Sequence, residues 1–305
     1  MSMIDSFSTD PDVEKEFENR MKNETKVDFM GKVTHFLELR FQWKHTKNGV
    51  QVHMPQEAFA DNLIEAAGLK PSSSTYMTPF RSGCPVDSIP QNSSTDELSA
   101  TMRSYVGSLL WLSMGIRPDL STITNILTKH QAYPTQRHID AVKYVIKYLK
   151  GTKNLGIQLD RNSDDSTNIQ SFLNFPVNSS KIKALTDANW GLQDQSVPKP
   201  NATPQHLGLY KSRSISAGYI VTLHGPIHWV SKRQSITARS STETEIYATD
   251  ECVKHLLHLH NIINGLQLAP QLLQDKIQIF NYNMACVQWT SNKTIKGLVT
   301  LYTNS

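Results

Sequence analysis

Three stretches of the chain have the residue types of a two-metal site that cleaves phosphodiesters, but the third lacks its carboxylate. Asp187 closes an alternating stretch, Glu243 and Glu245 open a long helical one, and Tyr282 follows an apolar run. Mg²⁺ prefers hard oxygen ligands, and two such ions held close together need several carboxylates. The residue types leave open whether this is a functioning site or the scaffold of one.

Of the two glutamates on the predicted helix, Glu245 is the candidate for chemistry. Glu243 and Glu245 are two residues apart, so they do not share a helix face. Ser240 and Glu243 have the spacing of a capping box, which gives Glu243 a structural role. Glu245 lies in the first turn, where the helix dipole favours the ionised form. Asp187 at a strand end can point into a cleft, although a lone Asp before Ala-Asn is more often a turn or capping residue.

The third stretch supplies no negative charge. Tyr282 and Asn283 follow a predicted strand at 276–281. Tyrosine is neutral near pH 7, and asparagine offers only a carbonyl oxygen. Asp187 and Glu245 can hold one Mg²⁺ with water completing its shell. Two ions need more negative charge, so the residues predict at most one weakly bound Mg²⁺.

Positive charge is concentrated in one part of the chain. The net charge is +4, but residues 103–153 include eight basic and two acidic residues, a local charge of +6. Lys143, Lys147 and Lys150 share one face of a predicted helix, with Tyr144 and Tyr148 beside them. A basic stripe beside aromatic rings suits a nucleic-acid backbone. An ordinary solvated lysine face is the commoner alternative.

Length and composition favour a globular protein of two domains. The chain has 305 residues, of which 38% are hydrophobic, and this is enough for two buried cores. The three cysteines form neither a metal-type pair nor a disulfide pattern, so a reducing, intracellular compartment is expected, cytoplasmic or nuclear. No apolar run is long enough to span a bilayer, so no membrane partner is expected. His255 and His258 share a helix but lack further zinc ligands nearby, which favours a solvated face.

Periodicity predicts a mixture of helices and strands, an α+β and α/β fold class. Helices are expected at 11–25, 56–69, 98–114, 120–133, 136–150, 241–266 and from Met284. Strands are expected at 33–43, 50–53, 151–160, 182–187, 216–223, 227–231 and 276–281. The Pro/Ser-rich stretch 71–94 is typical of a linker, and the Asn/Ser/Asp-rich stretch 161–180 is the expected domain boundary.

Several motifs resemble those of copia-type (pseudovirus) retrotransposon polyproteins, in that family's order and spacing. The matching stretches are 105–112, Arg117-Pro118-Asp119, 133–138, 148–152, 186–190, 216–219, 229–234 and 240–245. The resemblance implies a truncated reverse transcriptase region, with late palm, thumb and connecting helices, over residues 1–160. It implies an RNase H-like domain, a mixed sheet with helices, over residues 180–305.

The same resemblance implies roles for the candidate residues and exposes departures from the family. Asp187 and Glu245 match ligands of a two-Mg²⁺ site that cuts the RNA strand of RNA–DNA hybrids. Tyr282-Asn283 stands where an Asp-Asn pair is usual, and Glu38 stands where a glycine is expected. The polymerase Tyr-x-Asp-Asp and the final helix with its last carboxylate are also missing. The expectation is a C-terminally truncated fragment with a degenerate RNase H-like site and no polymerase activity.

Three functions stay open at this point. The first is an inactive fragment or decayed copy. The second is a module that binds RNA–DNA hybrid or other nucleic acid, with the rest of a polyprotein as a further partner. Its candidate contacts are Lys143, Lys147, Lys150, Lys232 and Arg233. The third is an active Mg²⁺-dependent RNase H with a rearranged site.

Overall fold

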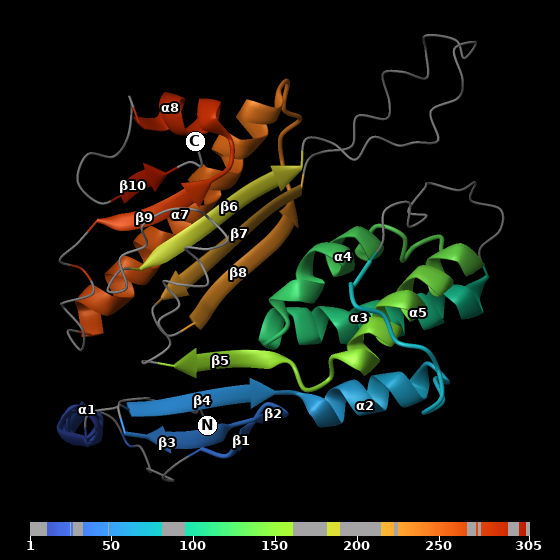
Figure 1. Ribbon diagram of the computed structural model, residues 1–305, viewed down its shortest axis with the longest axis horizontal. Coiled ribbons are helices and arrows are strands. Elements are labelled where there is room, and N and C mark those ends of the chain that lie inside the picture. Colours follow the sequence, from blue (N-terminus) through green and yellow to red (C-terminus); the bar gives the residue numbers. More distant parts are fainter. Residues whose placement is uncertain are drawn as a thin grey trace.

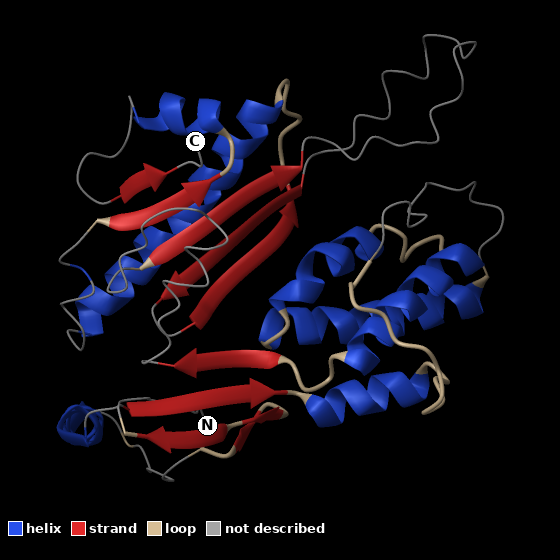
Figure 2. Cartoon of the chain, in the orientation of Figure 1, coloured by secondary structure: helices blue, strands red, loops and turns tan. Residues whose placement is uncertain are grey.

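The fold is that of a computed structural model. It describes residues 11–24, 26, 33–47, 49–80, 95–160, 182–189, 215–222, 225–266, 273, 276–291 and 299–302. Helices alternate with three sheets along this part of the chain (Figures 1 and 2). The helices are α1 (Pro11–Glu24), α2 (Glu57–Ala66), α3 (Asp96–Gly115), α4 (Pro118–Thr128), α5 (Gln136–Gly151), α7 (Ser241–Leu266) and α8 (Met284–Ser291). The strands are β1 (His35–Phe36), β2 (Leu39–Arg40), β3 (Gln42–Thr46), β4 (Gly49–Pro55), β5 (Gly156–Asp160), β6 (Lys183–Asn189), β7 (Ile215–Thr222), β8 (Gly225–Arg233), β9 (Ile277–Asn281) and β10 (Val299–Tyr302).

Helices α2 to α5 pack around one apolar core, and we call them the helical unit. The predicted stripe of α5 is fully inside it, since Ile139, Val142, Ile146 and Leu149 are all buried. Thr135 begins α5, and its backbone N–H donates to Nδ1 of His138 at 3.0 Å. This reciprocal arrangement satisfies a backbone donor that the first turn of a helix leaves without a partner.

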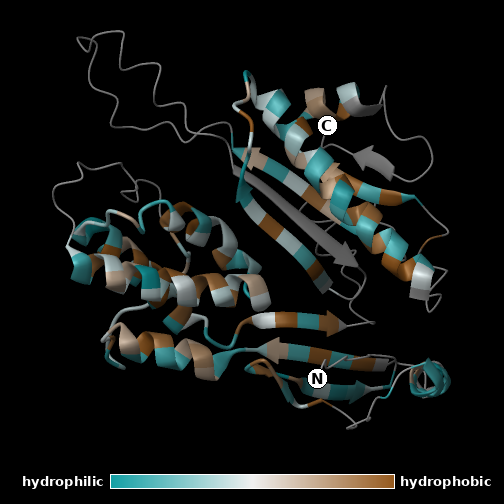
Figure 3. Ribbon diagram, turned by 180° about the vertical axis from the view of Figure 1, so that it is seen from behind, coloured by the Kyte–Doolittle hydropathy of each residue, from teal (hydrophilic) through white to brown (hydrophobic). Residues whose placement is uncertain are grey.

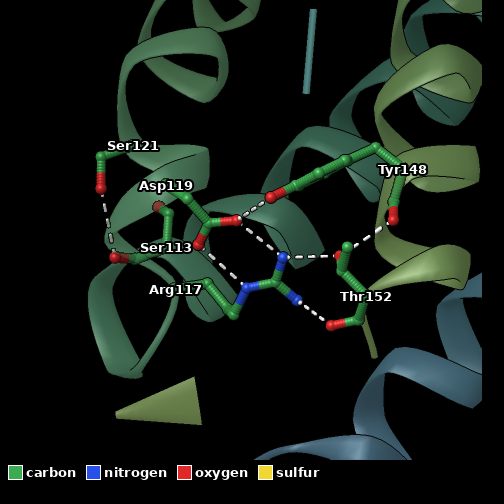
Figure 4. A network of polar contacts seen from close by, with 6 residues as sticks. All are labelled: Ser113, Arg117, Asp119, Ser121, Tyr148 and Thr152. Carbon is green, nitrogen blue, oxygen red and sulfur yellow. Dashed lines mark hydrogen bonds and ion pairs between the residues drawn. The ribbon is translucent and has the colours of Figure 1, made fainter. Parts of the chain in front are cut away.

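An ion pair between buried Arg117 and the more accessible Asp119 fixes the junction of α3, α4 and α5 (Figure 4). Arg117 is 2% exposed, and its guanidinium donates from Nε and Nη2 to the two carboxylate oxygens of Asp119 at 2.9 and 2.7 Å. The same guanidinium donates to the backbone oxygen and the hydroxyl of Thr152, at 3.0 and 2.9 Å. Tyr148 adds a hydrogen bond from its hydroxyl to Asp119 at 2.8 Å. Four of the five N–H groups of the buried cation therefore donate to acceptors within the protein, which offsets much of the cost of burying its charge.

The largest sheet has the strand order β10-β9-β6-β7-β8. Strands β6, β7 and β8 are antiparallel neighbours, whereas β9 pairs in parallel with both β6 and β10. Helix α7 lies across one face of this sheet, as the view from behind shows (Figure 3). A second buried cluster, separate from that of the helical unit, forms between α7 and the strands β6 and β9. The division into two domains stays a prediction, and its expected boundary at 161–180 lies outside the described residues.

A smaller sheet, β3-β4-β5, lies beside the helical unit. Strands β1 and β2 form a hairpin closed by a two-residue loop. Leu37 and Glu38 form the hairpin loop with φ values of 47° and 63°. Two positive φ angles in succession are typical of a type I′ turn, which favours glycine or asparagine. The glycine expected in place of Glu38 therefore has a conformational reason.

Most predicted elements are confirmed, and three boundaries were wrong. The single strand expected at 33–43 is broken into β1, β2 and β3 by the positive-φ turn. The helix expected at 120–133 runs instead from Pro118 to Thr128, with proline in its first turn. The strand expected from residue 151 begins at Gly156, because α5 continues through Gly151. Among the described residues, no helix combines the length and the apolar character that crossing a membrane would need.

Replacing Glu38 with glycine should stabilise the fold by about 1 kcal/mol. Glycine removes the Cβ strain of a positive φ, which exceeds the extra entropy it gives the unfolded chain. Urea unfolding measures the change in the free energy of unfolding. Lys44→Gly, at an exposed position of β3, is the matched control and should destabilise. Equal destabilisation by both changes would contradict the turn assignment.

Replacing Asp119 with alanine should cost about 3 kcal/mol, because it leaves the Arg117 cation buried without its carboxylate. Asp140→Ala, which removes an exposed carboxylate hydrogen-bonded to the exposed Gln136, should change stability by less than about 0.5 kcal/mol. Equilibrium unfolding in urea compares the two variants with the wild type. A loss of under about 1 kcal/mol for Asp119→Ala would show that the ion pair is not a stabilising anchor.

Candidate functional site

The candidate site lies where β6, β9 and the first turns of α7 meet. The parallel pairing of β6 with β9 sets Thr186 opposite Asn281. Helix α7 packs over the same strands, so its first turns come to the ends of both. This arrangement brings Glu245 to Asn281 although the two are far apart in the sequence.

Asn281 links the three elements through its side-chain amide. Its Nδ2 lies 2.9 Å from the hydroxyl of Thr186 on β6 and 3.0 Å from Oε2 of Glu245 on α7. A longer contact of 3.4 Å reaches the hydroxyl of Thr249, one turn further along α7. Asn281 is 2% exposed, so these hydrogen bonds form away from water. Leaving such a buried amide without partners would cost about 1–3 kcal/mol.

Glu245 is buried, and its carboxyl holds a proton more readily than an ordinary glutamate does. Burial raises its pKa to about 6, and the nearby negative charge of Asp187 acts in the same direction. Hydrogen bonds from Asn281 and from the backbone N–H of Ala188 oppose the rise. The prediction that Asp187 and Glu245 lie close together is consistent with this electrostatic interaction.

Asp187 itself is exposed, whereas its neighbour Thr186 is buried against α7. Successive side chains of a strand point to opposite faces, so Asp187 projects from the side of β6 that α7 does not cover. Its carboxylate is therefore accessible to a ligand from solvent. Glu245 approaches the same strand end from the α7 side.

Glu243 has the structural role that its spacing predicted. Its carboxylate accepts a hydrogen bond from the backbone N–H of Arg239 at 2.6 Å, and its own N–H donates to the hydroxyl of Ser240 at 3.1 Å. These are the reciprocal bonds of a helix cap, with Arg239 as the donor instead of Ser240. Only Glu245 of the two glutamates faces the candidate site.

The sequence places Tyr282 at the third position of the site, but the side chain that lies against Glu245 belongs to Asn281. Tyr282, one residue later, is 51% exposed. Asn283 caps α8, since its Oδ1 accepts the N–H of Cys286 at 2.9 Å. The role of Asn281 was missed, although one signal was present, namely a polar residue that ends an otherwise apolar strand.

The donor set does not fit two magnesium ions. Asp187 and Glu245 provide the only carboxylates at this corner among the residues described. Asn281 turns its amide nitrogen, not its oxygen, towards Glu245, and its oxygen accepts the N–H of Asn283 at 2.7 Å. A search of the described residues finds no group of three or more His, Cys, Asp or Glu side chains that could hold a metal ion.

The predicted basic stripe of α5 is partly covered by the segment that follows α2. Lys150 donates from Nζ to the backbone oxygens of Lys70, Pro71 and Ser73, at 2.9, 2.7 and 2.7 Å. Lys147 lies over the ring of Tyr76, 5.7 Å from its centroid. Lys143 is half-buried on the same helix. In this structure Lys150 therefore stabilises the fold, and the stripe's contact with nucleic acid stays a prediction.

Lys232 and Arg233 lie on opposite faces of β8. Lys232 forms an ion pair with Glu251 on α7, the same carboxylate that Lys254 contacts at 2.9 Å. Arg233, the next residue of the strand, is exposed and points to the other side. The structure therefore separates the two basic residues that the sequence had grouped.

One histidine of α7, His255, contacts His228 on strand β8. The rings of His255 and His228 lie 4.3 Å apart, and burial lowers the pKa of both. The described residues form no metal-binding group of three or more side chains that would include these histidines.

Comparisons with known proteins point to transposable elements. No protein-family model matches the chain, and no solved structure gives a significant match. It is 34% identical over 144 residues to the retrovirus-related Pol polyprotein from transposon RE1 of Arabidopsis thaliana, which is 47% of this chain and 8% of that polyprotein. It is 23% identical over 253 residues to the transposon Ty1-NL2 Gag-Pol polyprotein of Saccharomyces cerevisiae, 81% of this chain and 12% of that polyprotein.

A third relative is of similar size to this chain. An uncharacterized mitochondrial protein of Arabidopsis thaliana is 28% identical over 223 residues, covering 72% of this chain and 75% of that protein. By contrast, the chain spans only about a tenth of the length of the Pol polyproteins that it matches. The chain is thus distantly similar, over about half its length, to the Pol polyproteins of copia- and Ty1-type retrotransposons.

Proposed function

We propose that this chain is the reverse transcriptase and RNase H-like part of a retrotransposon Pol polyprotein, able to bind RNA–DNA hybrid but unable to cleave it. The observation that carries the proposal is the corner of β6, α7 and β9. It brings together Asp187 and Glu245 and offers a neutral amide, that of Asn281, at the third position. The mixed sheet covered by α7 and the similarity to Pol polyproteins support the same reading.

Charge decides against two-metal chemistry at this corner. Two Mg²⁺ ions carry four positive charges, while Asp187 and Glu245 supply two negative charges when both are ionised. Hydrolysis by two metals needs ligands that hold the ions about 4 Å apart against their mutual repulsion. We infer that the pair binds at most one Mg²⁺, weakly, with water filling the remaining positions.

The residues that remain would bind without cutting. The backbone of a hybrid is a polyanion, and residues 103–153, which span most of the helical unit, carry a local net charge of +6 against +4 for the whole chain. Such binding is mainly electrostatic, so its affinity should fall steeply with salt. The alternative function is an active Mg²⁺-dependent RNase H with a rearranged site, which the exposure of Asp187 at the strand end would permit.

A cleavage assay on a labelled RNA–DNA hybrid with Mg²⁺ distinguishes the two functions. The wild type should give no cleavage above the EDTA control. Tyr282→Asp adds a carboxylate next to Asn281 and should raise the rate by about 100-fold or more over wild type, since a tenfold rate corresponds to about 1.4 kcal/mol. Tyr282→Asn is the matched control, which has similar size to aspartate without its charge.

The same assay contains the outcome that would overturn the proposal. If the wild type cleaves the hybrid and Asp187→Asn abolishes the cleavage, the alternative function holds. In the Tyr282→Asp background, Asp187→Asn should remove whatever activity was gained, because a single remaining pair of carboxylates returns the site to its present charge. Hybrid binding by fluorescence anisotropy should be retained in all of these variants.

Glu245 should also give the protein a characteristic pH dependence. Its pKa is about 6 in the folded protein against an ordinary 4.5, so the folded state binds more protons between these values. The free energy of unfolding therefore falls as pH rises through that window, by ~2 kcal/mol for this carboxyl. Glu245→Gln lacks the effect, so wild type should lose ~2 kcal/mol relative to this variant between pH 4.5 and pH 7. A constant difference across that range would show that the carboxyl is not perturbed.

A further inference from the structure

Strand β8 lies between α7 and the helical unit, and its alternating side chains face one or the other. His228 and Lys232 face α7, where they contact His255 and Glu251. Trp229 faces the helical unit, and its indole N–H donates to the backbone oxygen of Ser113 at 2.6 Å. Because side chains alternate along a strand, Ser231 and Arg233 face the helical unit as well.

Helix α4 follows the same strand edge in register. Asn125 donates from Nδ2 to the backbone oxygen of Ser231 at 2.8 Å. Lys129 comes four residues after Asn125, so it lies on the same side of α4 one turn later. Arg233 comes two residues after Ser231, on the same side of β8. The two geometries together set Lys129 opposite Arg233 at the seam between α4 and β8.

These two cations meet without a counter-charge. Lys129 is half-buried, and burial together with the positive charge of Arg233 lowers its pKa. Within the described parts of the chain, neither Lys129 nor Arg233 forms an ion pair, whereas Arg117, Lys232 and Lys254 all do. Like charges held close together repel, so the seam is more stable with an anion between them.

Strand β8 is packed against the helical unit beside these two cations. The hydroxyl of Ser231 is buried, and it has no hydrogen-bond partner among the residues described. It lies between Trp229 and Arg233 on the side of β8 that faces the helical unit. The two cations beside this packed contact, Lys129 and Arg233, are suited to the oxygens of a phosphate group.

We propose that Lys129 and Arg233 bind one backbone phosphate of a nucleic-acid strand at the α4–β8 seam. This inference rests on the proposed function, since it names where the bound strand touches the protein. A phosphate held here contacts the helical unit and the five-stranded sheet at once. Binding of the strand therefore holds the two units in their relative position.

The salt dependence of hybrid binding tests the contact. Fluorescence anisotropy gives the Kd of a labelled RNA–DNA hybrid between 50 and 300 mM KCl. Loss of one phosphate contact lowers the slope of log Kd against log salt by about 0.9. The double variant Lys129→Gln/Arg233→Gln should show this decrease and bind about tenfold more weakly at 100 mM KCl. Lys44→Gln, at an exposed position of β3, is the control and should keep the wild-type slope.

A second measurement reads the site without the hybrid. Inorganic phosphate, compared with chloride at equal ionic strength, should raise the Tm of the wild type and of Lys44→Gln but not that of the double variant. Circular dichroism confirms that each variant is folded before either measurement. An equal rise in Tm for wild type and double variant would overturn the anion site.

Failure of the seam contact and failure of the proposed function would give different results. If the wild type binds hybrid and the double variant keeps both its affinity and its slope, the seam contact is wrong while the proposed function stands. If the wild type does not bind hybrid at all, the proposed function fails. In that case a phosphate-specific rise in Tm would identify the seam as a site for free phosphate, and the assignment to a nucleic-acid strand would be overturned.

Discussion

The buried amide of Asn281 is the contact on which the candidate site depends. It hydrogen-bonds to Thr186 on β6 and to Glu245 on α7, so it fixes a strand, its parallel neighbour and the covering helix relative to one another. A tight turn cannot join two parallel strands, so the register between β6 and β9 depends on tertiary contacts such as these. The position of Glu245 near Asp187, and with it the raised pKa of Glu245, follows from this register. The contact that assembles the site thus also fills its third corner with a group that carries no charge.

The two units are joined through an edge strand. Strand β8 would otherwise expose unpaired backbone groups, which invite pairing with other chains. Asn125 and the helical unit cover this edge, and the buried Arg117 network holds the helices that do so in a fixed arrangement. The seam therefore has a structural purpose, and the two cations that face each other across it are a cost that an anionic partner would remove.

Much of the fold follows from local patterns, while the site depends on pairing that local patterns do not contain. The apolar stripe of α5, the extent of α7 and the capping role of Glu243 were predicted from spacing alone. The opposite directions of Lys232 and Arg233 could have been predicted too, because neighbours on a strand alternate. The carbonyl partners of Lys150 could not, since they belong to a turn 80 residues away. Asn281 was missed for the same reason, because its orientation depends on which strand lies beside β9.

With two carboxylates and a neutral amide, the corner of β6, α7 and β9 is expected to hold at most one divalent ion. The most direct measurement is the number of Mn²⁺ ions, used in place of Mg²⁺, that bind in the presence of a hybrid with a non-hydrolysable RNA strand, counted by electron paramagnetic resonance. The account predicts at most one weakly bound ion in the wild type, and its loss in Asp187→Asn. Two ions bound tightly to the wild type and lost together in Asp187→Asn would contradict it.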